Sequence, residues 1–172
     1  PPFGSRVEKD LKITEADKFT DQEKIKYYTK IYGEKYTNAL KQVNDNINKP
    51  VLSLYKSGNL STLTEVLFIE RCLNLLKPGG RLGIILPEGV LNNTNLQNVR
   101  ELFEGMAKII LITSIPQDVF MASGATVKPS LMFFKKFTKE EALQYEDAKT
   151  KAYYKIKEKY AESKYFFDIC EK

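Results

Sequence analysis

Apolar residues recur at helical spacing in the middle of the chain, at Val66, Ile69, Leu73 and Leu76. Thr62 followed by Glu65 matches a capping box at the start of this helix, and Pro78-Gly79-Gly80 matches a stop and a reversal. Residues 82–86 are uninterrupted by polar side chains, which is typical of a strand covered on both faces. The stretch 60–87 therefore predicts a helix, a turn and a buried strand whose carboxyl end is a place for a ligand.

Two more helices are predicted in the polar, lysine-rich segment 5–61. Thr20 and Glu23 suggest a capping box for the first helix, and Gly33 suits its end. The second helix extends to Pro50, with apolar positions at Tyr36, Leu40, Val43 and Ile47. We interpret 5–61 as a helical insertion. Its Tyr and Lys residues suit nucleic-acid contacts, but helices packed on a sheet have the same pattern, and we favour packing.

The pattern after Pro87 predicts a polar turn at 88–93, a helix at 96–106 and a strand at 109–115. This unit has the form of a right-handed βαβ connection. Residues 116–129 lack helical periodicity, and residues 130–137 are again apolar and aromatic. Because the connection 116–129 has no crossover helix, we expect the last strand to run antiparallel to its neighbours.

A long charged helix is predicted from Thr138 to about residue 161, with Thr138 and Glu141 as its capping box. Its apolar positions share one side and are Tyr145, Ala148, Ala152, Ile156 and Tyr160. Acidic and basic residues balance here, so we expect this helix to pack on the domain or on a partner.

Composition narrows the function classes. The 172 residues are 42% hydrophobic, which suits one domain, and no apolar run approaches membrane-spanning length. Histidine is absent and two cysteines stand far apart, which excludes a Ser-His triad, a Cys-His pair and a zinc site, and we predict no metal. The net charge of +5 is dispersed, so it permits a nucleic-acid partner without requiring one.

Four segments taken together carry a family resemblance. They are Pro1-Pro2-Phe3-Gly4, KPGGRLGIILPEGVL (77–91), PQDVF (116–120) and KPSLMFFKK (128–136). In order and wording they resemble the catalytic domain of adenine-specific DNA methyltransferases, in particular the modification subunit of type I restriction systems and the related fused restriction-modification enzymes. The resemblance implies an α/β, Rossmann-like S-adenosylmethionine-dependent methyltransferase fold. Its partial sheet would have parallel strands and a final antiparallel strand, with added helices.

The resemblance also implies a domain division and a site. Residues 1–137 would be the second half of the catalytic domain, with 5–61 as the insertion, and 138–172 a C-terminal helical extension. Pro1, Pro2 and Phe3 would be catalytic, preceded in the family by an asparagine. The family's glycine-rich loop for S-adenosylmethionine and its acidic ribose ligand lie upstream of this tetrapeptide, so the cofactor residues are unknown here, and we expect the chain to be cut from a longer one.

These residue types suit methylation of an adenine amino group, whose lone pair is delocalised into the ring. Two acceptors aimed at its hydrogens favour a pyramidal nitrogen in the transition state. The asparagine would supply one acceptor and the Pro1 carbonyl the other, and Phe3 would stack on a base flipped out of the duplex.

The expected function is therefore transfer of a methyl group from S-adenosylmethionine to adenine by the parent protein, with this chain inactive alone. Expected partners are double-stranded DNA and the specificity and restriction subunits, in the cytoplasm of a bacterium or archaeon and without membrane binding. Two alternatives remain: methylation of RNA or of a protein glutamine, and a non-catalytic Rossmann-like interaction module.

The family order also predicts the arrangement of the sheet. The strand at 130–137 would insert between those at 82–86 and 109–115, and the strand at 82–86 would be left with an unpaired apolar edge. Because such an edge invites pairing, we expect self-association or cover from part of 5–61.

Overall fold

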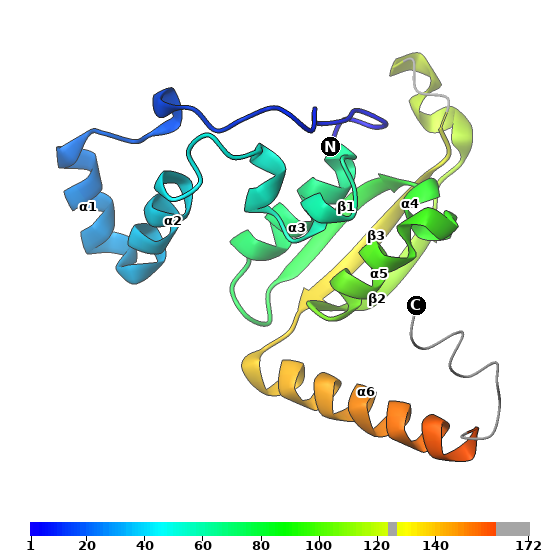
Figure 1. Ribbon diagram of the computed structural model, residues 1–172. Coiled ribbons are helices and arrows are strands. Elements are labelled where there is room, and N and C mark those ends of the chain that lie inside the picture. Colours follow the sequence, from blue (N-terminus) through cyan, green and yellow to red (C-terminus); the bar gives the residue numbers. More distant parts are fainter. Residues whose placement is uncertain (124–126, 161–172) are drawn as a thin grey trace.

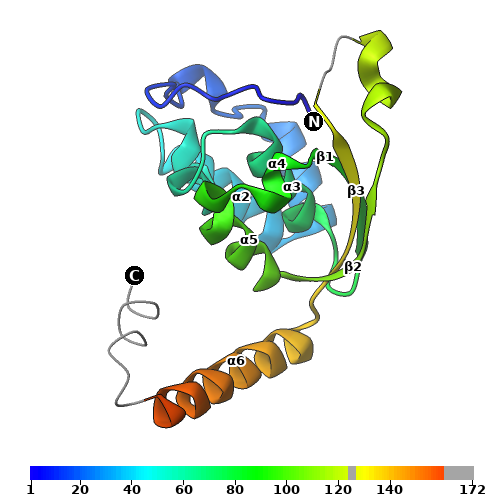
Figure 2. The same cartoon turned by 90° about the vertical axis from the view of Figure 1, so that its right-hand side faces the viewer.

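Helices on one face of a three-stranded sheet make up the body of the molecule, and a separate helix extends from it (Figures 1 and 2). The computed structural model describes residues 1–123 and 127–160. The α-helices are α1 (Gln22–Tyr32), α2 (Glu34–Asn44), α3 (Thr64–Leu75), α4 (Gly89–Asn92), α5 (Gln97–Glu104) and α6 (Lys139–Lys159). The strands are β1 (Arg81–Pro87), β2 (Ala107–Ser114) and β3 (Pro129–Lys136). Short 3-10 helices are η1 (Glu15–Asp17), η2 (Val51–Leu54), η3 (Ser57–Asn59), η4 (Thr94–Leu96) and η5 (Gln117–Ser123).

The last strand lies in the middle of the sheet, and the strand order is β1-β3-β2. Met132 of β3 pairs with Ile84 on one side and with Ile112 on the other. This confirms the predicted insertion of β3 between the other two strands. The expected fold combined parallel strands with a final antiparallel strand, and among the described residues only antiparallel pairs are formed. β1 and β2 point the same way, but β3 separates them.

The core lies between the sheet and the helices α3, α4 and α5 (Figure 2). Its fully enclosed side chains include Val66, Ile69, Leu73, Leu86 and Val99. The opposite face of the sheet is uncovered in the described part of the chain, where Gly83 is exposed and Leu111 retains 51% of its accessible surface. The prediction of a strand covered on both faces is therefore wrong, because the helices that pack on this sheet all lie on one side of it.

Helices α1 and α2 pack against each other and stand apart from the sheet (Figure 1). The Tyr28 ring contacts those of Tyr32 and Tyr36, and neither helix has a buried residue. Packing of these helices on the sheet, which we favoured, is thus wrong. Asp21 caps α1 by accepting from the Lys24 amide, in place of the predicted Thr20 box, while Gly33 with φ +58° does separate the two helices.

The chain leaves the body of the molecule before α1 and returns to it after α2 at the same place. Lys12 forms a β-bridge with Pro50, and the Ile13 amide donates to the Lys49 carbonyl at 3.0 Å. On the other side of this bridge, the Val51 amide donates to the Leu11 carbonyl at 2.8 Å. These bonds close the ends of the segment 14–48 against each other.

The predicted turn after α3 is confirmed, with Gly79 at φ +76°. Lys77 lies beyond the helix, and it is Lys136 Nζ that donates to the carbonyls of Leu73 (2.7 Å) and Leu76 (2.9 Å). Burial lowers the pKa of Lys136 from its ordinary value. The expected polar turn at 88–93 contains the short helix α4, whose end is held by the Arg100 guanidinium on the Asn93 carbonyl at 2.7 Å.

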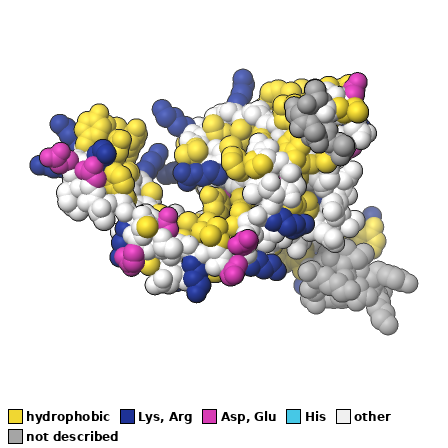
Figure 3. Space-filling view, turned by 90° about the horizontal axis from the view of Figure 1, so that it is seen from above, with side chains coloured by type: hydrophobic (Ala, Val, Ile, Leu, Met, Phe, Trp, Pro, Cys, Tyr) yellow, Lys and Arg dark blue, Asp and Glu magenta, His cyan; other side chains and the backbone are white. Residues whose placement is uncertain are grey.

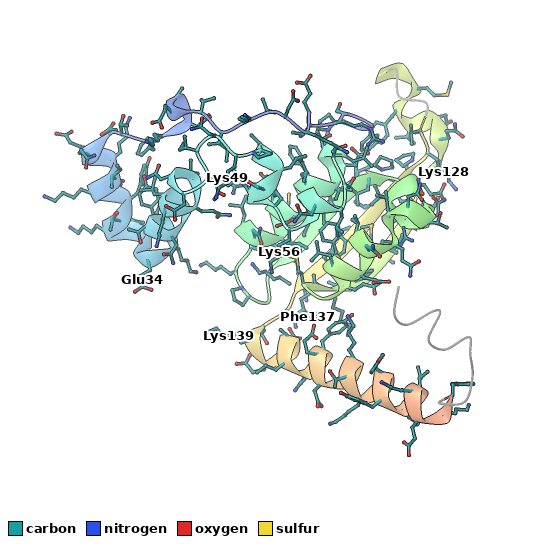
Figure 4. The ribbon with its side chains drawn as sticks, viewed as in Figure 1. Glu34, Lys49, Lys56, Lys128, Phe137 and Lys139 are labelled. Carbon is teal, nitrogen blue, oxygen red and sulfur yellow. The ribbon has the colours of Figure 1, made fainter. Side chains whose placement is uncertain are left out.

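Helix α6 begins with the predicted capping box of Thr138 and Glu141 and then extends away from the body (Figures 1 and 2). The Phe137 ring lies at its base, 5.5 Å from the Tyr145 ring (Figure 4). No residue of α6 is buried, so packing of this helix on its own sheet is not seen. The positions expected from residue 161 onward lie outside the described residues.

Strand β1 is at the edge of the sheet, as predicted, and no described residue of 5–61 pairs with it. We expect the isolated chain to self-associate through β1, because the outer backbone groups of this edge strand are available to another strand. Hydrogen exchange at two protein concentrations measures this: the outward amides of β1 should exchange more slowly at the higher concentration. Rapid exchange of these amides in a stable monomer would contradict the prediction.

Candidate active site

The Pro1-Pro2-Phe3 turn lies at the end of the sheet where β1 finishes (Figures 1 and 2). The connection from β2 to β3 crosses the same end, because Pro87 pairs with Pro129 and Ser114 with Ser130. Three segments far apart in sequence therefore meet here: the tetrapeptide, the start of α3 and η5.

Hydrogen bonds from the first turn of α3 hold the tetrapeptide in place. The Thr64 amide donates to the Ser5 carbonyl at 2.9 Å, and the Thr64 hydroxyl lies 3.0 Å from the Pro2 carbonyl oxygen. The Gly4 amide donates to Glu65 Oε1 at 3.3 Å, and Glu65 is only 3% exposed. Thr64 and Glu65 thus hold the segment from Pro2 to Ser5 against the start of α3.

The capping box predicted from Thr62 and Glu65 is not formed. The N-cap of α3 is Leu63, which makes no side-chain cap. Glu65 accepts from Gly4 instead, and the Thr62 hydroxyl accepts from the Arg6 guanidinium at 3.1 Å. Local spacing suggested the box, but partners distant in sequence take both side chains.

The carbonyl groups of the turn differ in whether a hydrogen-bond donor of the chain reaches them. Pro2 and Ser5 have carbonyls within reach of Thr64, whereas no described residue donates a hydrogen bond to the Pro1 carbonyl. Proline also contributes no N–H of its own. The described residues thus leave the Pro1 carbonyl free to accept from a bound group.

An aromatic pair stands beside this carbonyl. The Phe3 and Phe120 rings are 6.4 Å apart between centroids and 85° apart in plane, an edge-to-face arrangement, and both are half-buried. Phe120 comes from η5 and was not among the predicted site residues. The signal was present, since Phe120 ends the PQDVF segment, which we used only for the resemblance.

The connection that carries η5 is tied to the rest of this edge. The Glu88 amide donates to the Lys128 carbonyl at 2.9 Å, and Lys128 Nζ lies 3.4 Å from Glu88 Oε1. Figure 4 shows Lys128 beside α4 at this end of the sheet. These contacts hold the start of β3 against the residue that follows β1.

Two carboxylates near this edge have partners within the chain. Glu65 accepts from the Gly4 amide, and Glu88 lies within ion-pair distance of Lys128. No glycine-rich phosphate-type loop is found in the sequence. In the described ranges no three acidic, Cys or His side chains lie together as a metal site would need, and no helix there is long and apolar enough to span a bilayer.

One family model matches most of the chain, and two solved structures are similar to parts of it. The model of the N-6 DNA methylase family matches residues 8–166. Among solved structures, a Listeria monocytogenes protein assigned to the class I S-adenosylmethionine-dependent methyltransferases is similar at 22% identity and a TM-score of 0.41, over 46% of this chain and 24% of that one. A structure on the assembly and conformational transition of the type I R-M system matches at 32% identity and a TM-score of 0.40, over 44% of this chain and 16% of that one.

The chain therefore spans less than a quarter of the length of either solved structure. A comparison with the curated proteins found no match.

Proposed function

Because the chain belongs to the N-6 DNA methylase family, we propose that it forms the target-base side of the catalytic pocket of an adenine-specific DNA methyltransferase. The observation that carries the proposal is the Pro1 carbonyl, which accepts from no described residue and lies on a turn that Thr64 and Glu65 hold in place. Members of the family use S-adenosylmethionine, which supplies the methyl group.

The chain's own residues bind and orient the base in this proposal. The Pro1 carbonyl accepts a hydrogen bond from the adenine amino group, and the asparagine expected before Pro1 accepts the second. Phe3 stacks on the flipped base, and Phe120 supports the Phe3 ring from its edge. Both acceptors act most strongly on the pyramidal nitrogen of the transition state, which lowers the barrier.

The division of the chain into domains, as we propose it, leaves the cofactor side of the catalytic pocket outside this chain. We propose that residues 1–137 are the second half of the catalytic domain, with 5–61 inserted, and that 138–172 are an extension. The sequence holds no glycine-rich loop of the kind that the family uses for S-adenosylmethionine, which supports a cofactor site built by a preceding part of the protein.

We expect the isolated chain to transfer no methyl group and to bind S-adenosylmethionine weakly. The full-length protein should transfer labelled methyl groups to adenine in duplex DNA, and should leave RNA and glutamine peptides unlabelled. Calorimetric titration of the isolated chain with the cofactor is the second measurement. Submicromolar binding by the chain alone would overturn the half-domain division, and labelling of RNA or of the peptide would overturn the DNA substrate.

Helix α6 is the proposed docking surface for a specificity subunit of a type I complex. It extends from the body, and its apolar side chains are exposed, with Ile156 at 48%. Ile156→Glu should abolish binding of that subunit, because a charge would enter the apolar contact, while the thermal midpoint should change little.

Leu143→Glu is the matched control for this prediction. Leu143 lies on the same helix and is 72% exposed, but its position is about 220° around the helix from Ile156. Pull-down with the specificity subunit should distinguish the two variants. A large fall in the thermal midpoint of Ile156→Glu would show that Ile156 packs within its own chain.

A further inference from the structure

A recess of about 580 Å³, lined by both polar and apolar side chains, begins at Arg6, three residues after Phe3. Its walls come from the extended N-terminal segment, from the segment before α3 and from the α4–η4 connection. Its polar lining residues include Arg6, Lys9, Asn59, Thr62, Asn93 and Asn95. Figure 3 views this side of the molecule from above and shows Lys and Arg side chains projecting from it.

The wall of the recess is continuous with the turn that carries Phe3. Arg6 forms a β-bridge with Leu63, and the Val7 amide donates to the Thr62 carbonyl at 2.9 Å. A chain covers at most about 3.5 Å per residue, so Arg6 lies within about 11 Å of Phe3 along the backbone and Lys9 within about 21 Å. Phosphates recur every 3.4 Å along a DNA strand, measured on the helix axis. Both cations are thus within a few phosphates of a base stacked on Phe3.

The charged residues that line the recess are both cations, Arg6 and Lys9. Both are exposed, and neither forms an ion pair with any residue that the structure describes. Arg6 donates one N–H to Thr62, which leaves its other guanidinium donors for a ligand. The amide groups of Asn59 and Asn95 add neutral donors of the kind that contact phosphate and sugar oxygens.

We propose that this recess binds the sugar–phosphate backbone of the DNA strand whose base is flipped, with Arg6 and Lys9 on its phosphates. The proposal rests on the proposed function and extends it, because it says where the strand continues beyond the flipped base. Contacts to phosphates fix the register of the strand without reading its sequence, so they place the adenine under the Pro1 carbonyl.

The test is the salt dependence of DNA binding by the full-length protein, measured by fluorescence anisotropy without the methyl donor. Each phosphate contact contributes about 0.9 to the slope of log K against log salt. The double variant Arg6→Gln/Lys9→Gln should therefore lower the slope by about 1.8 and weaken binding about five- to tenfold per cation at 0.1 M salt. The loss should be the same for specific and unrelated duplexes.

Two matched variants make the result specific. Lys26→Gln/Lys30→Gln removes the same charge from exposed positions on α1, away from the recess, and should leave the slope unchanged. Arg6→Lys/Lys9→Arg keeps both charges and should retain the slope. An unchanged slope in the recess variant, or an equal loss in the α1 variant, would overturn the proposal. Methyl transfer by the unaltered protein is measured separately, so failure of the proposed function would be seen there.

Discussion

Replacing Glu70 by alanine is expected to lower the free energy of unfolding by about 3–5 kcal/mol. Glu70 Oε2 accepts from the Ser57 amide at 2.7 Å and from the Ser57 hydroxyl at 2.6 Å, and Oε1 accepts from the Lys56 amide at 3.0 Å. Glu70 is 3% exposed and Ser57 is fully buried. Without the carboxylate, the amide and the hydroxyl of Ser57 remain buried and unpaired, and the partly buried Lys56 amide also loses its acceptor.

Urea denaturation monitored by circular dichroism would measure the loss. Glu70→Gln keeps one acceptor oxygen and should fall between alanine and the unaltered chain. Glu146→Ala removes an exposed carboxylate on α6 and should change the free energy by less than about 0.5 kcal/mol. A loss below about 1 kcal/mol for Glu70→Ala would mean that the segment 51–59 is not held by this carboxylate.

Phe3→Ala in the full-length protein should lower turnover about 5- to 150-fold, the equivalent of about 1–3 kcal/mol of base stacking. The dissociation constant of S-adenosylmethionine should change by less than about twofold, because the ring is proposed to hold the base and not the methyl donor. Single-turnover methylation and cofactor titration would measure the two quantities separately.

Two further variants separate base stacking from protein packing. Phe3→Tyr keeps the ring and should retain most of the turnover. Phe120→Leu removes the edge contact only and should cost less than Phe3→Ala. Equal loss of turnover and cofactor affinity in Phe3→Ala would instead indicate that the whole turn has changed its conformation.

Elements whose signals are local were predicted well from the sequence. The helix, turn and strand between residues 60 and 87 are α3, Gly79 at positive φ and β1, and Thr138 with Glu141 does form a capping box. The central place of β3 was also correct, but that came from the family order and not from periodicity.

Features that depend on distant partners were not predicted. Glu65 was assigned to a local cap, and its partner is Gly4, 61 residues away in sequence. The apolar faces of α1 and α2 were recognised, but periodicity does not say which surface such a face meets, and they meet each other. Phe120 was missed because a loop aromatic has no periodic signal, and only the fold brings it to Phe3.

The closed ends of the segment 14–48 bear on how this protein can change over evolutionary time. The Lys12–Pro50 bridge and the Ile13–Lys49 bond hold the two ends of this segment together. The distance between the points where the segment leaves and re-enters the body is therefore fixed, whatever the length of the segment. Doubling the length of such a loop costs only about 0.6 kcal/mol in closure entropy. A change in the length of this lobe should therefore leave the contacts of the Pro1-Pro2-Phe3 turn with the start of α3 in place.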